Sequence, residues 1–279
     1  MRLYMQSVYY QLKHLSAALI LSLSLGFVSL VSSPAHSYGG IGHDAFCQLA
    51  FDLSSPKTQQ VLQSFADQHP DYEDFASMCN WADNIKSDKR WDWAKPHHYV
   101  NFARGSAKVT AADCAANGCI LSAIQHHYDV LKHDRTDWIA LAFLAHFIGD
   151  LHQPMHVSFA DDLGGNRARL SYFDEATNLH RLWDTQMLMQ RGGSDSKAKA
   201  SELLRGLSPL KPAAIDAEQT LAWANESAAI TRRIYSNYRA EQKLGQSYTD
   251  QWGPVLEQRM QQGAQRLAAV LDELYSDSF

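Results

Sequence analysis

Apolar residues recur at helical spacing over most of the chain. From about Trp138 to Leu151 the sequence is apolar on nearly every side, which predicts a buried central helix. Apolar positions three and four residues apart between Leu256 and Leu274 predict a second long helix. A similar pattern after Asp216 predicts a third, and shorter helices are expected over residues 44–53 and 58–66.

Strand patterns are scarce. Residues 162–166 (DLGGN) have the composition of a turn, and residues 168–173 are expected to form one arm of a small hairpin. Residues 191–212 are rich in small and polar side chains, so a surface excursion is expected there. No repeat, low-complexity tract or linker divides the sequence. The prediction is therefore an all-α, mainly helical single domain with a small β-hairpin.

The first residues differ from the rest. Residues 15–31 are almost wholly apolar, and Ala35 and Ser37 form the small-residue pattern that signal peptidase cleaves. We therefore predict that residues 1–37 are a signal peptide, that residues 38–279 are the mature domain, and that the protein is secreted or periplasmic. The alternative is an uncleaved membrane anchor, which the short apolar run disfavours.

Export would change the charge of the protein and the state of its cysteines. Removing the two cations in the leader, Arg2 and Lys13, takes the formal net charge from −5 to −7. Such an acidic protein has no general attraction for nucleic acid, so positive charge for that substrate must be local, as bound metal would supply. An oxidising compartment would allow the four cysteines to pair.

Histidines and aspartates in pairs are the most informative residues. His146 and Asp150 lie four apart in the predicted central helix, which places them on one face. A proline two residues before His156 is expected to end that helix, so His156 can face the same point. His180 and Asp184 repeat the four-residue spacing. Imidazole and carboxylate are zinc ligands, and burying an unpaired carboxylate is costly, so the set predicts a metal site.

Further motifs lie around these pairs in a defined order. They are YGGIGH at 38–43, WAD at 81–83, HYVN at 98–101, HFIGDLHQPMH at 146–156, GGN at 164–166 and NLHRLWD at 178–184. In this order they resemble the zinc-dependent nucleases of the S-one/P-one type, which share a superfamily with phosphatidylcholine-preferring phospholipase C. The resemblance covers nearly the whole mature chain and implies the helical fold of that superfamily.

The resemblance implies three zinc ions held by nine residues. A free α-amino group at Tyr38 would exist only after the signal peptide is removed. The family usually carries Trp at this position, but the ligand atoms are backbone atoms. The implied ligands are Asp83, His98, His146 and Asp150 for the first ion; His156, His180 and Asp184 for the second; and His43, the shared Asp150, and the amine and carbonyl of Tyr38 for the third.

The resemblance also assigns residues to the substrate. Asp83 would orient the nucleophile or accept its proton, and Lys86, where the family often has Arg, would neutralise the phosphoryl group. An exposed helix lysine is the alternative for Lys86. Asn101 matches a base-contacting position, with a local backbone cap as its alternative, and Asn166 would bond near the phosphate or simply close its turn. Candidates for base stacking, with the core as their alternative place, are Tyr99, Phe102 and Tyr172.

The cysteines lie near these ligands. Cys47 follows His43 by four residues and Cys79 precedes Asp83 by four, so the convergence implied by the resemblance predicts a Cys47–Cys79 disulfide. The short loop between Cys114 and Cys119 predicts the other disulfide. Four cysteines allow three pairings, and zinc ligation is the alternative for the short loop.

Together these features predict a zinc-dependent endonuclease that hydrolyses single-stranded RNA or DNA to 5′-phosphate products, with a 3′-nucleotidase activity suggested by the resemblance. We expect a monomer that binds single-stranded nucleic acid or nucleotides and has no stable membrane association after leader cleavage. The alternatives are a phosphatidylcholine-type phospholipase C, whose relatives carry Glu where this chain has Asp184, and a non-catalytic zinc-binding protein.

Overall fold

The computed structural model describes residues 39–210 and 215–276. The predicted signal peptide and Tyr38 lie outside these residues. The helices are α2 (Gly39–Leu53), α3 (Pro56–Asp67), α4 (Phe75–Met78), α5 (Trp81–Asn84), α6 (Ile120–His133), α7 (Trp138–His152), α8 (Leu179–Arg181), α9 (Met187–Gln190), α10 (Ser196–Arg205), α11 (Ala217–Asn237) and α12 (Gln246–Tyr275).

Short turns of tighter or wider helix and five short strands join these helices. The 3₁₀ turns are η1 (Ile85–Ser87), η2 (Lys89–His98), η3 (Ala111–Asp113), η4 (Pro154–His156) and η5 (Ala160–Asp162), and η6 (Leu182–Gln186) is a π-helix. The strands are β1 (Val100–Phe102), β2 (Val157–Phe159), β3 (Arg169–Tyr172), β4 (Glu175–Asn178) and β5 (Gln242–Leu244). The described residues form one compact, mainly helical unit, which confirms the predicted fold class.

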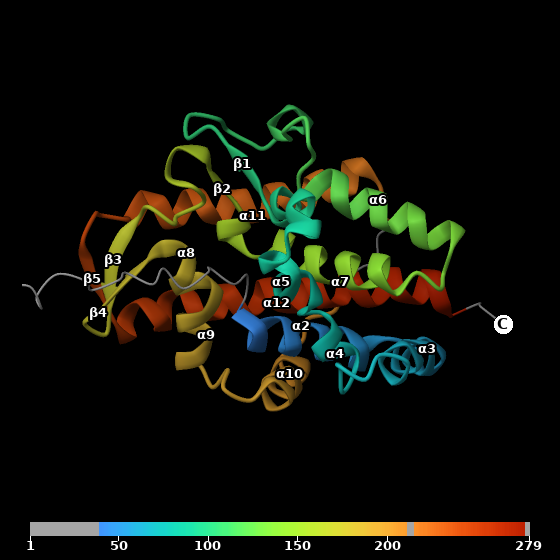
Figure 1. The fold of residues 1–279 in the computed structure, drawn as a ribbon. Helices are drawn as coiled ribbons and strands as arrows, with labels where there is room; N and C mark the ends of the chain where they lie inside the picture. The colour runs from blue at the N-terminus through green and yellow to red at the C-terminus, as the bar shows by residue number, and fades with distance from the viewer. Residues whose placement is uncertain (1–38, 211–214, 277–279) are drawn as a thin grey trace, which may run out of the picture. The chain divides into compact units, whose positions relative to one another are not determined.

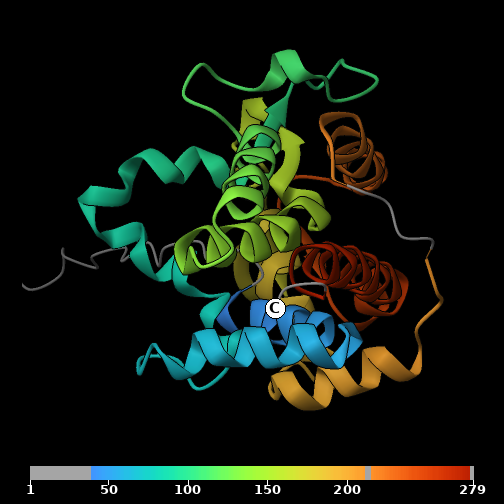
Figure 2. The ribbon, with the colours of Figure 1, turned by 90° about the vertical axis from the view of Figure 1, so that its right-hand side faces the viewer.

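Helix α7 lies at the centre of this unit (Figure 1). Asp137 caps its N-terminus by accepting a hydrogen bond from the Ala140 amide at 2.9 Å. Every residue from Ala140 to His152 is buried, because α2, α6, α11 and α12 pack around the helix (Figure 2). The helix ends two residues before Pro154, whose ring cannot continue it. The predicted central helix is confirmed.

Two small sheets complete the fold. β1 and β2 pair in parallel with Val100 opposite Val157. Because His98 lies two residues before Val100 and His156 directly precedes Val157, this register brings the two histidines together. In the second sheet β3 and β4 form the predicted antiparallel hairpin, and β5 adds a parallel strand that was not predicted.

Residues 191–212, where a surface excursion is expected, contain the helix α10, which packs against α2 and leaves most of its residues exposed. Asp195 caps this helix by accepting a hydrogen bond from the Ala198 amide. Lys199 is fully buried, donates to the Arg191 carbonyl at 2.9 Å and pairs with Glu257 of α12. A lysine looks exposed in the sequence, and the tertiary partner Glu257 explains why Lys199 is buried here.

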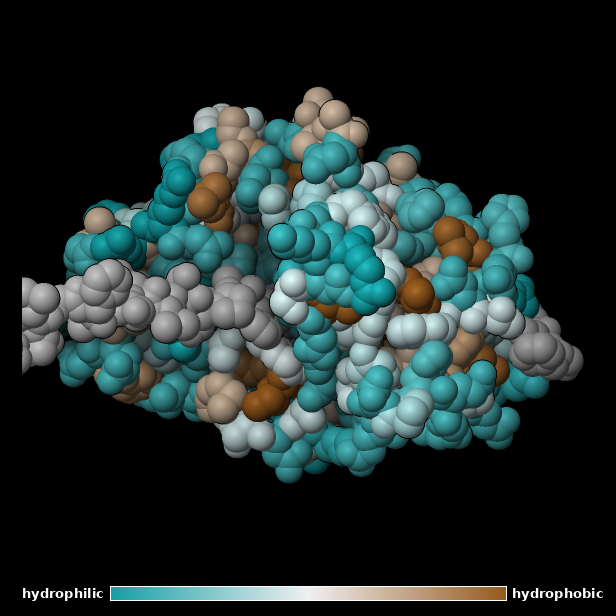
Figure 3. All heavy atoms as spheres, viewed as in Figure 1, coloured by the Kyte–Doolittle hydropathy of each residue, from teal (hydrophilic) through white to brown (hydrophobic). Residues whose placement is uncertain are grey.

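The surface is mainly hydrophilic on the face drawn in Figure 3, where apolar side chains form small separate patches. Single exposed apolar residues are normal on a protein that faces water. In the part of the chain that the structure describes, no helix has the length and apolarity to cross a membrane.

Candidate metal centre

The first group of candidate ligands surrounds Asp150 on α7. His146 lies one turn earlier on the same face, with its Nε2 atom 3.2 Å from Asp150 Oδ2. His98, at the end of η2, places Nδ1 2.9 Å from the same oxygen. His43, from the middle of α2, places Nε2 3.2 Å from the other oxygen, Oδ1. All four side chains are buried, so one carboxylate joins three imidazoles from three separate elements.

Asp83 joins this group from α5. Its Oδ1 atom lies 3.4 Å from His146 Nε2 and 3.7 Å from His98 Nδ1. Lys86, one turn later, places its ammonium 2.5 Å from the same oxygen and is partly exposed. The structure therefore brings together Asp83, His98 and His146, and separately His43, His146 and Asp150, with ligand atoms close enough to share an ion in each set.

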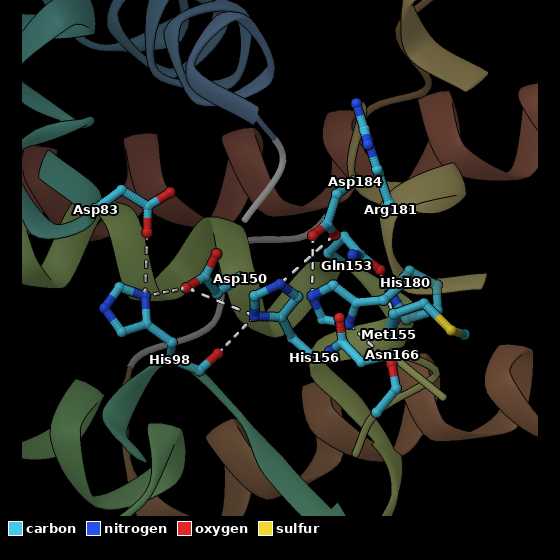
Figure 4. Close-up of polar contacts among 12 residues, drawn as sticks. Asp83, His98, Asp150, Gln153, Met155, His156, Asn166, His180, Arg181 and Asp184 are labelled. Carbon is cyan, nitrogen blue, oxygen red and sulfur yellow. Dashed lines mark hydrogen bonds and ion pairs between the residues drawn. The ribbon is translucent and has the colours of Figure 1, made fainter. Parts of the chain in front are cut away.

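The second cluster combines His156, His180 and Asp184. His180 Nε2 lies 2.9 Å from Asp184 Oδ2, and His156 Nε2 lies 3.6 Å from Asp184 Oδ1. The expected helix between His180 and Asp184 is the single turn α8 followed by the π-helix η6. Such π turns are rare and occur often at functional sites. Figure 4 shows this cluster beside the Asp150 group, with the side chains of both pointing toward a common space.

The hydrogen bonds of the imidazoles test whether these clusters fit a metal. His146 Nδ1 lies 2.7 Å from the Cys79 carbonyl, His156 Nδ1 2.6 Å from the His98 carbonyl, and His180 Nδ1 2.8 Å from the Gly164 carbonyl. A carbonyl only accepts, so each Nδ1 carries a proton, and each ring in its neutral form would present an Nε2 lone pair to the carboxylates.

An imidazole lone pair and a carboxylate that face each other repel unless a proton or a metal ion lies between them. Asp184 strengthens this argument, because among the described residues neither of its buried oxygens accepts a hydrogen bond of normal geometry. The donor set is imidazole and carboxylate, with a carbonyl behind each of three rings, which is how proteins orient zinc ligands. The residues therefore fit a divalent metal such as zinc.

The pKa shifts show that the buried carboxylates attract positive charge to this site. Burial opposes the charged form of His146, but Asp150 and Asp83 outweigh it and raise its pKa to about 10. Burial likewise opposes charge on His156, yet Asp150 and Asp184 raise its pKa to about 9. Burial would raise the pKa of Asp150, but His146 and His156 hold it well below its usual range. Without metal, protons on imidazoles balance the carboxylates, and a divalent cation would replace them.

The pKa values of His98 and His43 are shifted in the opposite direction from those of His146 and His156. Burial and the nearby charge of Lys86 lower the pKa of His98 to about 3, and burial followed by the charge of His146 lowers that of His43. Both rings are therefore neutral at pH 7, which is the form that binds a metal.

Two disulfides support this region, in the pairs that the sequence predicts. Cys47 in α2 is bonded to Cys79, and Cys114 is bonded to Cys119. The first bond links the helix that carries His43 to the residue whose carbonyl holds His146. It therefore ties two ligands from segments that are far apart in the sequence.

A cavity of about 270 Å³ opens beside the ligands. Three ligands from both clusters, His98, His156 and His180, line it. Four of the predicted substrate contacts, Lys86, Tyr99, Asn101 and Asn166, also line it, and the remaining lining residues are Lys95, Met155, Leu163 and Gly164.

The lining residues differ in what they offer a ligand. Tyr99 is 41% exposed, so its ring is available for stacking. Among the described residues the buried Asn101 Oδ1 atom accepts no hydrogen bond, whereas Asn166 donates to the Leu163 carbonyl at 2.9 Å within its turn. Phe102 and Tyr172 are buried core residues, so their prediction as stacking candidates is wrong.

Sequence analysis missed Lys95 as a cavity residue. It lies three residues before His98 in the 3₁₀ turn η2, and residues three apart share a face of such a turn. It also pairs with Asp92 at 2.6 Å. The spacing from His98 is the signal that would have found it.

His152 belongs to none of the candidate ligand groups among the described residues. It is fully buried, with Nδ1 2.7 Å from the Ile148 carbonyl and Nε2 2.8 Å from the Arg266 guanidinium. A carbonyl accepts and a guanidinium donates, so the ring donates at one nitrogen and accepts at the other. Both nitrogens are therefore occupied away from the metal clusters.

Comparisons with known proteins agree with this geometry. The sequence model of the family S1/P1 Nuclease matches residues 38–276. Endonuclease 3 of Arabidopsis thaliana is 28% identical over 268 residues, which cover 86% of this chain and 89% of the relative. Nuclease S1 of Aspergillus oryzae is 26% identical, with 86% and 93% covered, and nuclease P1 of Penicillium citrinum is 26% identical, with 85% and 98% covered.

Proposed function

Since the chain belongs to the S1/P1 nuclease family, we propose that it is a zinc-dependent endonuclease that hydrolyses phosphodiester bonds of single-stranded RNA and DNA to 5′-phosphate products. The observation that carries this proposal is the convergence of the buried His/Asp groups at one wall of a cavity. Relatives named endonuclease and nuclease support the same class of reaction.

Three zinc ions are proposed at these groups. Asp83, His98, His146 and Asp150 would hold the first. His43 and Asp150 would hold another, with the amine and carbonyl of Tyr38 completing its ligands after cleavage of a signal peptide. His156, His180 and Asp184 would hold the remaining ion. When bound, zinc supplies Lewis acidity that polarises a phosphoryl oxygen and lowers the pKa of water.

The protein's own side chains bind and orient the substrate. The Lys86 ammonium lies at the cavity wall beside Asp83 and can donate to a phosphoryl oxygen as negative charge develops there. Asp83, held ionised because His146 and Lys86 outweigh the effect of burial, can orient a water or accept its proton.

The cavity favours an unpaired base. Asn101 Oδ1 is buried with no hydrogen bond from the described residues, so it can accept one from a base edge. The half-exposed ring of Tyr99 offers a stacking surface at the same rim. Bases in a duplex have both faces covered, so such a site selects single strands. A 3′-nucleotidase activity, a monomeric state and secretion with removal of residues 1–37 complete the proposal.

The test uses protein purified after export. Its amino-terminal residue and zinc content are measured, and it is then assayed on single-stranded RNA and DNA, on duplex DNA and on phosphatidylcholine vesicles. We expect a chain that starts at Tyr38, about three zinc ions, and oligonucleotides ending in 5′-phosphate from the single strands. Lipid turnover with intact RNA would identify a phospholipase C instead, and bound zinc without any hydrolysis would identify a non-catalytic protein.

A further inference from the structure

Three hydroxyl groups form a stripe on α11. Ser227, Thr231 and Tyr235 are spaced four residues apart, so they lie on one face of the helix. Ser227 and Thr231 are fully buried. This face packs against α7, η4 and β2, the segment that runs from Asp150 to His156 and beyond. The stripe therefore contacts the segment that carries the candidate ligands, and none of its three residues lines the cavity.

Each of the first two hydroxyls binds a backbone carbonyl next to a ligand. Ser227 Oγ donates to the Leu151 carbonyl at 2.6 Å, and Leu151 follows Asp150. Thr231 Oγ1 lies 2.6 Å from the Pro154 carbonyl and 3.0 Å from the Val157 carbonyl, which flank His156. These carbonyls belong to the end of α7 and the turn after it, where intrahelical partners run out.

The third hydroxyl acts on the turn that holds His180. Tyr235 Oη donates to Asp162 Oδ2 at 2.6 Å. The other oxygen of Asp162 accepts from the Gly165 amide at 2.9 Å, and the neighbouring Gly164 carbonyl accepts from His180. Tyr235 is thus connected to the His180 ring through one side chain and one turn of backbone.

Arg259 of α12 fixes the direction in which the Ser227 hydroxyl donates its proton. Its Nη2 atom donates to Ser227 Oγ at 2.9 Å, so the Ser227 proton must point to Leu151. Its Nε atom donates to the His152 carbonyl at 3.3 Å. The guanidinium is almost fully buried and pairs with Glu226, which keeps it in place.

We propose that Ser227, Thr231 and Tyr235 are positioning residues that set the separation of Asp150, His156 and His180, and hence the affinity of the zinc ion held by His156, His180 and Asp184. The inference rests on the zinc sites proposed above. Metal ligands must be held within about 0.5 Å, and loss of the groups behind them typically lowers metal affinity roughly 10- to 100-fold. Thr231 and Tyr235 act on two of the three ligands of this ion.

Thr220 provides a matched control on the same helix. It is buried like Thr231, but its hydroxyl has no hydrogen-bond partner among the described residues. Thr231→Val and Thr220→Val make the same chemical change, and only the first removes a bond to the ligand-bearing segment. Thr231→Ser keeps the hydroxyl and serves as the rescue variant.

The experiment measures zinc occupancy of the full mature protein equilibrated at graded free zinc. For Thr231→Val we expect one ion to bind at least tenfold more weakly while the others keep their affinity, with Thr231→Ser and Thr220→Val matching the wild type. Equal zinc affinities in Thr231→Val and Thr220→Val would overturn the inference. A uniform weakening of all ions would do so too, because it indicates general loss of packing.

Tyr235→Phe keeps the inference testable if Thr231→Val does not fold, since Tyr235 is only partly buried. We expect Tyr235→Phe to weaken the binding of the same zinc ion, and an unchanged affinity would count against the positioning role of the stripe. If the wild-type protein bound no zinc, the proposed function itself would be refuted. If the wild type bound zinc and Thr231→Val and Tyr235→Phe bound it equally tightly, only the positioning role would be refuted.

Discussion

Replacing Asp150 by Asn should remove zinc selectively. Asp150 Oδ1 faces His43 and Oδ2 faces His98 and His146, whereas the two oxygens of Asp184 face the Nε2 atoms of His156 and His180. Zinc binding of roughly 10–16 kcal/mol shared among four ligands is about 3 kcal/mol per ligand. Losing one carboxylate should then weaken each affected ion about 100-fold.

The expected zinc content therefore falls from about three ions to about one in Asp150→Asn, and from about three to about two in Asp184→Asn. The assay is zinc analysis after dialysis at a fixed free-zinc concentration, together with hydrolysis of single-stranded RNA. Asp129→Asn, an exposed change on α6, is the matched control and should behave as the wild type. If Asp150→Asn kept its full zinc content and activity, Asp150 could not be the shared ligand.

Three further perturbations probe the scaffold around the metal centre. Removing the Cys47–Cys79 bond, which closes 32 residues, should lower the free energy of unfolding by about 3–4 kcal/mol, and removing Cys114–Cys119 by about 2 kcal/mol; chemical denaturation of the two double alanine variants would measure both, and equal losses would contradict the loop-length argument. Burial opposes charge on Glu226, but Arg266 and Arg259 outweigh it and lower its pKa below 4.5, so its stabilisation is complete above about pH 4.5 and is lost as the pH falls through the lower folded value. Glu226→Gln should flatten the decline of unfolding free energy in this acid range, and an unchanged decline would contradict the assignment. Gly164 has φ +66° and a Cβ there would lie 2.9 Å from the Met155 carbonyl, so Gly164→Ala should reduce activity at least tenfold in steady-state assays, whereas Gly105→Ala, which meets nothing within 4 Å, should not.

The sequence predicts those parts of the site that lie close together along the chain. The spacing of His146 and Asp150 is a property of any helix, and the apolar run around them indicates burial, so this pair is predictable from one segment. His43 and Asp83 reach the same point from other helices. Their convergence depends on tertiary packing and was implied only by the family resemblance.

The missed elements have long-range causes. β5 pairs with β3 across some 70 residues of sequence, and its short polar segment carries no strand pattern of its own. α10 has a local signal in its N-cap Asp195, but the burial of Lys199 against Glu257 comes from a contact that a local pattern cannot show. Tyr172 illustrates the converse error: an aromatic residue after a glycine-rich turn resembles a binding residue, but its hydroxyl bonds Thr249 inside the core.

The parallel pairing of β1 with β2 has a consequence for sequence change in this region. The pairing begins with Val100 opposite Val157 and ends with Phe102 opposite Phe159. Beyond that point the chain makes a long excursion before α6 begins at Ile120, and the disulfide at Cys114 closes its far end. Val109 in this excursion is buried and its amide donates to Asn225, so among the described residues of the excursion only the tip from Gly105 to Lys108 is free of such contacts. Insertions at that tip should therefore leave the alignment of His98 with His156 intact. We expect a reporter peptide at this exposed tip to leave catalysis undisturbed.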